Sequence, residues 1–148
     1  MADINFTPQR YFQAAQTHPK MTRDLLEAQQ HFAAHYFAGV AIECMLRAHG
    51  VPAGVTFDSS HSLMYWAEKS NLLAPNDEAN SLPSRGPIIE ANYRWRANQR
   101  YMTPKMLDTH LHGLGLDKIR GDRIKYSANR MLEIAARIIE LGVKAWKR

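Results

Sequence analysis

The sequence contains a single cysteine, Cys44, among its 148 residues, so no disulfide can form within the chain. A lone thiol suits a reducing compartment, and we expect a cytoplasmic protein. No run approaches the roughly 18 consecutive apolar residues of a membrane span, so no membrane partner is expected. The first ten residues also lack the basic and then apolar pattern of a secretory signal.

Patterns typical of metal sites and phosphate loops are also missing, including HExxH and glycine-rich loops. His110 and His112 are two residues apart, so on a helix their side chains diverge and cannot share one ion. His31 and His35 are one turn apart and could share an ion, but no acidic or thiol ligand is close to them in the sequence. We therefore expect no metal and no other cofactor.

What the sequence does have is an excess of basic residues. Lysine and arginine total 19 against 14 aspartates and glutamates, a formal net charge of +5. Such a surface favours polyanions, RNA above all. Hydrophobic residues make up 45% and charged residues 22%, which is typical of a folded globular chain. The length suits one domain, and we predict a single helical domain over residues 1–148.

Helical periodicity runs through the chain, and no strand-like alternation competes with it. A helix is predicted from about Thr7 to Thr17, and a longer one from Pro19 to His49 that Gly50 ends. Long amphipathic helices with shorter ones between them predict an all-α fold, an antiparallel bundle of four to five helices. The other predicted helices are Ser60–Leu73, Pro87–Tyr101, Thr103–His112 and Gly121–Trp146, with a connector over Ala74–Arg85.

The segment AHYFAGVAIECMLRAHG, from Ala34 to Gly50, resembles the signature helix of HEPN domains. The matching residues are Tyr36, Ala38, Gly39, Glu43, Leu46, Arg47 and Ala48. After a loop, His61-Ser62-Leu63 is similar to the histidine and apolar helix that the family commonly places there, although Ser62 replaces a more usual acidic residue. The resemblance implies an HEPN-like bundle that forms a homodimer.

Many HEPN proteins are ribonucleases of toxin–antitoxin, CRISPR or phage-defence systems, and others are non-catalytic partners of small nucleotidyltransferases. The ribonucleases carry an arginine, four to six residues, and then a histidine. Here seven residues separate Arg23 from His31 and nine separate Arg100 from His110, so this motif is absent. Its absence favours a binding protein over an enzyme.

The resemblance thus implies a prokaryotic HEPN-type module, in a toxin–antitoxin or phage-defence setting, that binds RNA, a nucleotide or a nucleotidyltransferase partner protein. Two alternatives stay open. One is a divergent, metal-independent ribonuclease with His61, Arg96 and Arg100 as its catalytic candidates. The other is a purely structural or antitoxin-like interaction protein.

Glu43 falls on the apolar side of its predicted helix, on one stripe with Phe32, Tyr36 and Gly39. A buried carboxylate needs a partner, because an unpaired charge is costly to desolvate. We therefore expect Glu43 to form a buried polar pair with an arginine, histidine or tyrosine from another helix. His61 is one candidate: it could bond Glu43 or cap the next helix, or act as a general acid or base, since histidine titrates near neutral pH.

The segment NYRWRANQRY, from Asn92 to Tyr101, mixes arginines with aromatic residues and contains no acidic residue. Arginines among aromatics suit phosphate contacts and base stacking. The alternative is that one face of this helix pairs with carboxylates while Trp95 packs in the core. The predicted nucleic-acid or phosphate contacts are Tyr93, Arg94, Arg96, Arg100 and Tyr101.

Overall fold

Helices make up nearly all of the structure. The computed structural model describes residues 6–51, 59–72, 78–117 and 119–146, with the backbone alone over 78–85; these ranges hold six α-helices, one 3-10 helix and no strand. The all-α fold class is therefore confirmed. The described residues contain as many α-helices as the sequence analysis predicted segments, although the bundle itself was expected to have four to five. The elements are α1 (Pro8–Glu27), α2 (His31–Gly50), α3 (Leu63–Ser70), α4 (Glu78–Arg94), η1 (Ala97–Tyr101), α5 (Pro104–Leu114) and α6 (Arg123–Ala145).

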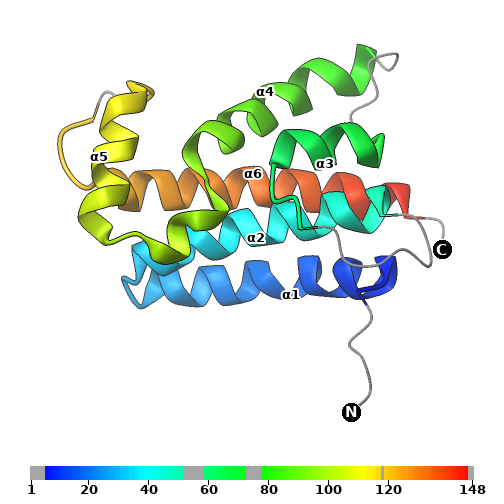
Figure 1. Ribbon diagram of the computed structural model, residues 1–148, viewed down its shortest axis with the longest axis horizontal. Helices are drawn as coiled ribbons and strands as arrows, with labels where there is room; N and C mark the ends of the chain where they lie inside the picture. The colour runs from blue at the N-terminus through cyan, green and yellow to red at the C-terminus, as the bar shows by residue number, and fades with distance from the viewer. Residues whose placement is uncertain (1–5, 52–58, 73–77, 118, 147–148) are drawn as a thin grey trace.

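The helix α2 is the centre of the bundle, with α1 on one side of it and α6 on another (Figure 1). Its residues from Ala41 to Ala48 are all buried. Small side chains such as Ala34, Ala38 and Ala41 have no exposed surface, and they let neighbouring helices approach closely. The structure also shows that none of the described helices is both long enough and apolar enough to cross a membrane.

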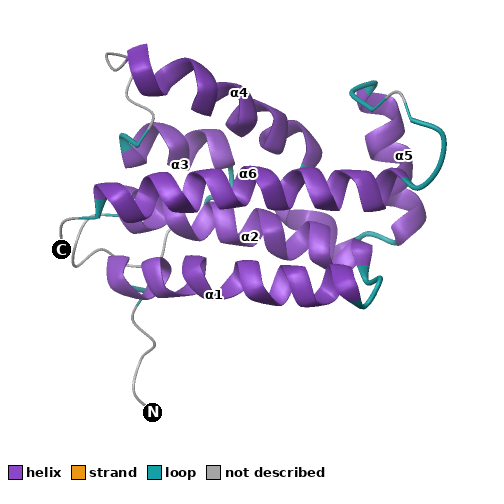
Figure 2. Ribbon diagram, turned by 180° about the vertical axis from the view of Figure 1, so that it is seen from behind, coloured by secondary structure: helices purple, strands orange, loops and turns teal. Residues whose placement is uncertain are grey.

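The three long helices do not all alternate in direction. The α1–α2 pair is an antiparallel hairpin, but α2 and α6 run parallel, as Figures 1 and 2 show. The side-chain contacts agree, because His35 bonds Ser127 near the start of both helices and His49 bonds Gly142 near the end of both. The elements α3, α4, η1 and α5 bring the chain back before α6 begins; α3 and α4 cover one side of the bundle and α5 lies at one end.

The predicted boundary between the first two helices was wrong. We placed a new helix at Pro19, but Pro19 is buried inside α1, and the chain turns at Ala28–Gln30. Gln29 has a φ of 59°, a left-handed conformation that the sequence did not signal with glycine or asparagine. Burial of the α1 face against α2 offsets the backbone hydrogen bond that Pro19 cannot donate.

The predicted helix from Pro87 to Tyr101 is interrupted. The observed α4 begins earlier, at Glu78, and ends at Arg94. Arg96 then has φ −130° and ψ 136°, an extended conformation, before η1 begins at Ala97. The residues from Pro87 to Tyr101 therefore do not lie on the one continuous helix that the sequence predicted. Of the predicted connector, residues 78–85 belong to α4 and residues 74–77 lie outside the described part of the chain.

Candidate functional site

A groove of about 270 Å³ lies between the start of α3 and the segment that joins α4 to η1. Two residues predicted from separate segments of the sequence, His61 and Arg96, both line this groove. Arg94 and Arg100 do not line it. Asn92 and Asn98 add two side-chain amides. The lining residues are His61, Ser62, Leu63, Asn92, Trp95, Arg96, Ala97 and Asn98.

A stripe along α2 holds the α4–η1 segment in place. The indole of Trp95 packs directly over Gly39, where even a Cβ atom would overlap the ring. The indole N–H of Trp95 donates to the carbonyl oxygen of Tyr36 at 3.0 Å. Because Gly39 and Tyr36 are one turn apart, both contacts come from the same helix face. The absence of a side chain at Gly39 thus makes room for the Trp95 ring.

The next turn of the same stripe holds His61. Nδ1 of His61 lies 3.0 Å from Oε1 of Glu43, which itself is buried. Glu43 also accepts from Nε of Arg47 at 3.2 Å, so its main cationic partner comes from the same helix and not from another. An Arg four residues after a Glu is a spacing that allows an ion pair on one helix face, and the sequence analysis missed this signal.

Arg47 is more deeply buried than any other charged residue that the structure describes, at 1% exposed. Its guanidinium lies 4.5 Å from the centre of the Trp66 ring and donates to the carbonyl oxygen of Ser60. A buried cation of this kind is tolerated only with a carboxylate and further hydrogen bonds. Glu43 therefore has two tasks: it neutralises Arg47 and it orients the imidazole of His61.

Arg94 does not belong to the groove. It is 3% exposed, and its two terminal nitrogens bond Asp117 at 2.7 and 2.6 Å while Nε bonds Glu90 at 2.8 Å. These carboxylates raise the pKa of Arg94 above its usual value, against the opposing effect of burial. Arg94 is a structural cation, which corrects its assignment as a phosphate-binding residue.

Arg96 and Arg100, by contrast, are exposed and form no ion pair with a carboxylate in the described part of the chain. The guanidinium of Arg100 lies 5.0 Å from the ring centre of Tyr101, which is 76% exposed. Hydrogen bonding to Tyr101 and then to Tyr36 raises the pKa of Arg100. Tyr93 is half exposed on α4, but it does not line the groove.

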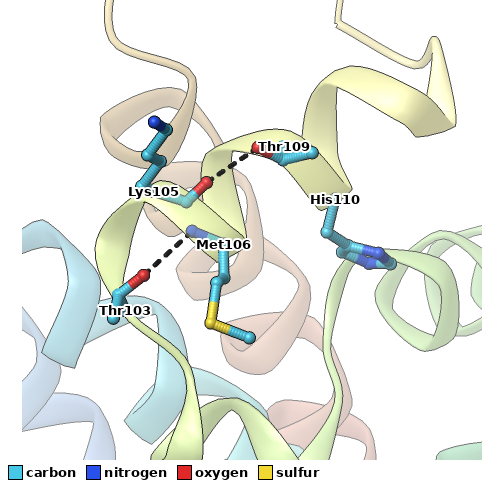
Figure 3. A pocket seen from close by; sticks show the side chains of 5 residues that line it. All are labelled: Thr103, Lys105, Met106, Thr109 and His110. Atoms are coloured by element: carbon cyan, nitrogen blue, oxygen red, sulfur yellow. Dashed lines mark hydrogen bonds between the residues drawn. The ribbon is translucent and has the colours of Figure 1, made fainter.

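A second hollow of about 460 Å³ lies on α5 and is lined by Thr103, Lys105, Met106, Thr109 and His110 (Figure 3). Three of its polar side chains form hydrogen bonds within the chain, and the side chain of Lys105 extends away from the other four in Figure 3. Thr103 caps the helix through the N–H of Met106, and Thr109 donates to the carbonyl oxygen of Lys105. The His110 ring bonds the carbonyl oxygen of Tyr93. No polar groups are left converging on a ligand.

Thiol and metal chemistry find little support. Cys44 is buried, and burial raises the pKa of its thiol to about 12, so it stays protonated at neutral pH. In the ranges that the structure describes, no three His, Cys, Asp or Glu side chains are grouped so that they could hold a metal ion.

No family model, no curated protein and no solved structure matches this chain.

Proposed function

We propose that this chain binds single-stranded RNA, with Arg96 in the groove and Arg100 beside it as the phosphate-binding residues. The observation that carries the proposal is the pair of exposed guanidiniums without carboxylate partners, one of them in a groove with two asparagine amides. Some exposed cations elsewhere are paired with acids, such as Lys20 with Asp24, and others, such as Arg23 and Arg137, form no ion pair in the described part of the chain. What distinguishes Arg96 is therefore its place in the groove.

The dimensions and chemistry favour a single strand over a duplex. The groove has a volume of only about 270 Å³, so a base that enters it must be unstacked and unpaired, as bases in single-stranded RNA can be. Single-stranded RNA is bound through its phosphates and through bases that stack on aromatic rings or guanidinium planes. Arg100 lying over Tyr101 provides such a platform at the surface. The amides of Asn92 and Asn98 can donate to and accept from base edges.

The resemblance to HEPN domains supports the same proposal. The residues that carry it include Glu43 and His61, and these two form the hydrogen bond at one wall of the groove. The resemblance and the geometry thus point to the same surface.

The test is a comparison of two charge-matched double variants. Arg96→Ala with Arg100→Ala removes the proposed phosphate contacts. Arg23→Ala with Arg137→Ala removes two exposed arginines, on α1 and α6, that form no ion pair in the described structure. Binding of a fluorescent single-stranded RNA is measured by anisotropy over a series of salt concentrations.

The groove variant should bind more weakly and lose about two phosphate contacts, which lowers the slope of log K against log salt by about 1.4. The control pair should keep most of the affinity. Equal binding by both variants, or no binding by the parent at physiological salt, would overturn the proposal.

A second candidate, a metal-independent ribonuclease, is favoured by one observation: His61 lines the same groove as Arg96, and its Nδ1 is held by Glu43. A carboxylate in this position fixes the tautomer and orientation of a general base. His61 would accept the 2′-hydroxyl proton as the 2′-oxygen attacks phosphorus, and Arg96 would stabilise the phosphorane. The protonated His61 would then give its proton to the departing 5′-oxygen as the bond from phosphorus to that oxygen breaks, leaving a 2′,3′-cyclic phosphate and a 5′-hydroxyl. Cleavage of RNA in the presence of a chelator, lost in His61→Gln with binding retained, would support this reading. Intact RNA after prolonged incubation with the parent would exclude it.

A further inference from the structure

The segment from Trp95 to Tyr101 alternates between buried and exposed residues. Trp95 and Gln99 are buried, at 3% and 1% exposed, whereas Arg96, Asn98 and Arg100 face outward. The two buried side chains bond carbonyl oxygens of α2 that are one turn apart: Trp95 bonds Tyr36, and Gln99 bonds Phe32 at 2.9 Å. The groove arginine therefore sits between two anchors on one helix.

The second anchor is the end of a buried chain of hydrogen bonds. Because the Gln99 amide nitrogen donates to Phe32, its oxygen accepts from Nδ1 of His35 at 2.7 Å. Nε2 of a neutral His35 then accepts from the Ser127 hydroxyl at 2.9 Å. Ser127 in turn accepts from Arg94 at 3.2 Å, so every link has one donor and one acceptor.

The far end of this chain is fixed by charge. Arg94 is held by Asp117 and Glu90, and Glu90 also accepts from Nε and Nη2 of Arg130 at 2.7 and 3.0 Å. The chain of hydrogen bonds thus begins at a network of ion pairs that joins α4, α6 and the loop after α5, and it ends at η1. A buried polar network whose members are all satisfied is rigid and specifies one arrangement of the parts it joins.

We propose that Gln99, His35 and Ser127 are positioning residues for the RNA-binding groove. They fix η1 on α2, so that Arg96 and Asn98 face the groove before any ligand arrives. This inference rests on the proposed function, because it assigns to these residues the preorganisation of that same site. A ligand that meets a preorganised segment does not have to supply the free energy of ordering it.

The test variant is Gln99→Met, which keeps the length of the side chain and removes both of its hydrogen bonds. We expect RNA affinity to fall about tenfold while the salt slope stays that of the parent, since no charge is removed. We also expect faster hydrogen exchange at the amides of Gln99 and Met102, which bond Arg96 and Gln99 within η1. Ser127→Ala, at a residue two hydrogen bonds away from Gln99, should change both measurements in the same direction. This variant keeps the inference testable if Gln99→Met does not fold.

The control is Ile138→Ala, a buried position about 16 Å further along α6 from Ser127. It should lower the melting temperature without changing affinity or exchange in η1, which separates positioning from general stability. If the parent binds RNA, and Gln99→Met and Ser127→Ala both bind it as tightly as the parent does, the inference is overturned. If the parent binds no RNA, the proposed function fails, and the exchange data alone decide: unchanged exchange in η1 overturns the positioning as well.

Discussion

Glu43 and Arg47 lie one turn apart on α2, and each is the other's ion-pair partner. The side chain of Glu43 is 11% exposed and that of Arg47 is 1% exposed, so water cannot replace a lost partner. His61, the other side chain that bonds the Glu43 carboxylate, is half buried. Replacing Glu43 therefore measures the cost of leaving a buried arginine without its ion-pair partner.

Glu43→Ala should lower the free energy of unfolding by about 3–5 kcal/mol, because it leaves the Arg47 guanidinium buried without its carboxylate. Urea denaturation at neutral pH measures this. The matched control is Glu140→Ala, whose ion pair with Lys144 is mostly exposed and should be worth less than about 1 kcal/mol. Similar losses in the two variants would show that the buried pair has no special weight.

His35 makes stability depend on pH. Burial lowers the pKa of His35 to about 4 from an ordinary value of 6.5, with the bond to Gln99 opposing it in part. The unfolded chain therefore binds a proton between these values that the folded chain does not, so stability falls as pH falls from about 6.5 to 4. The full loss is about 3 kcal/mol.

Urea denaturation at several pH values between 4.5 and 7.5 checks the sign and size of this effect. His35→Gln, which cannot titrate, should weaken the dependence in this window; the part that remains has the same sign and comes from His18, because burial lowers its pKa as well. A parent whose stability is constant from pH 7.5 to 4.5 would refute a buried, neutral His35.

At the scale of elements, the packing of Trp95 on Gly39 of α2 fixes the position of a residue that lines the groove. Gly39→Ala would place a methyl group inside the indole ring, so Trp95 must move. Overpacking costs about 1–3 kcal/mol, which exceeds the gain of about 1 kcal/mol in helix propensity. We expect a lower melting temperature, a shifted Trp95 indole N–H resonance and weaker RNA binding.

Gly113 provides the control for this prediction. It also lies within a helix, α5, but a Cβ there would meet no other atom within 4 Å. Gly113→Ala should therefore leave RNA binding unchanged and raise stability by up to about 1 kcal/mol. If Gly39→Ala were stabilised to the same degree, Trp95 would not be packed on Gly39 as described.

Periodicity predicted the elements better than their ends. The end of α2 at Gly50 and the stripe of Phe32, Tyr36, Gly39 and Glu43 followed from the sequence. The break after Arg94 did not, because no glycine or proline marks it. It arises from tertiary contacts: Trp95 turns onto α2, and Gln99 bonds a helix that is more than sixty residues earlier in the chain.

At the scale of the whole molecule, long-range pairs decided which arginines are available. Arg94 and Arg96 are two residues apart and look equivalent in the sequence. The first pairs with Asp117 and the second lies in the groove, and only the fold separates them. The same holds for Arg130, which pairs with Glu133 of its own helix and also with Glu90 of α4.

The homodimer stays a prediction. The resemblance implies it, and large apolar side chains are exposed on several elements, among them Ile89 and Tyr93 on α4 and Met106 on α5. Light scattering at micromolar concentration should give twice the chain mass of 16.9 kDa. A mass of one chain at every concentration tested would contradict it.

The most direct test of the central claim is a nuclear magnetic resonance titration of the labelled protein with a short single-stranded RNA. The proposal predicts that the largest shift changes fall on the backbone amides of Arg96 and Asn98, the side-chain amide of Asn92 and the Trp95 indole N–H. Resonances of the distant basic residues Arg23 and Arg137 should barely move. Shifts confined to α1 or α6, or an unchanged spectrum at saturating RNA, would contradict the account.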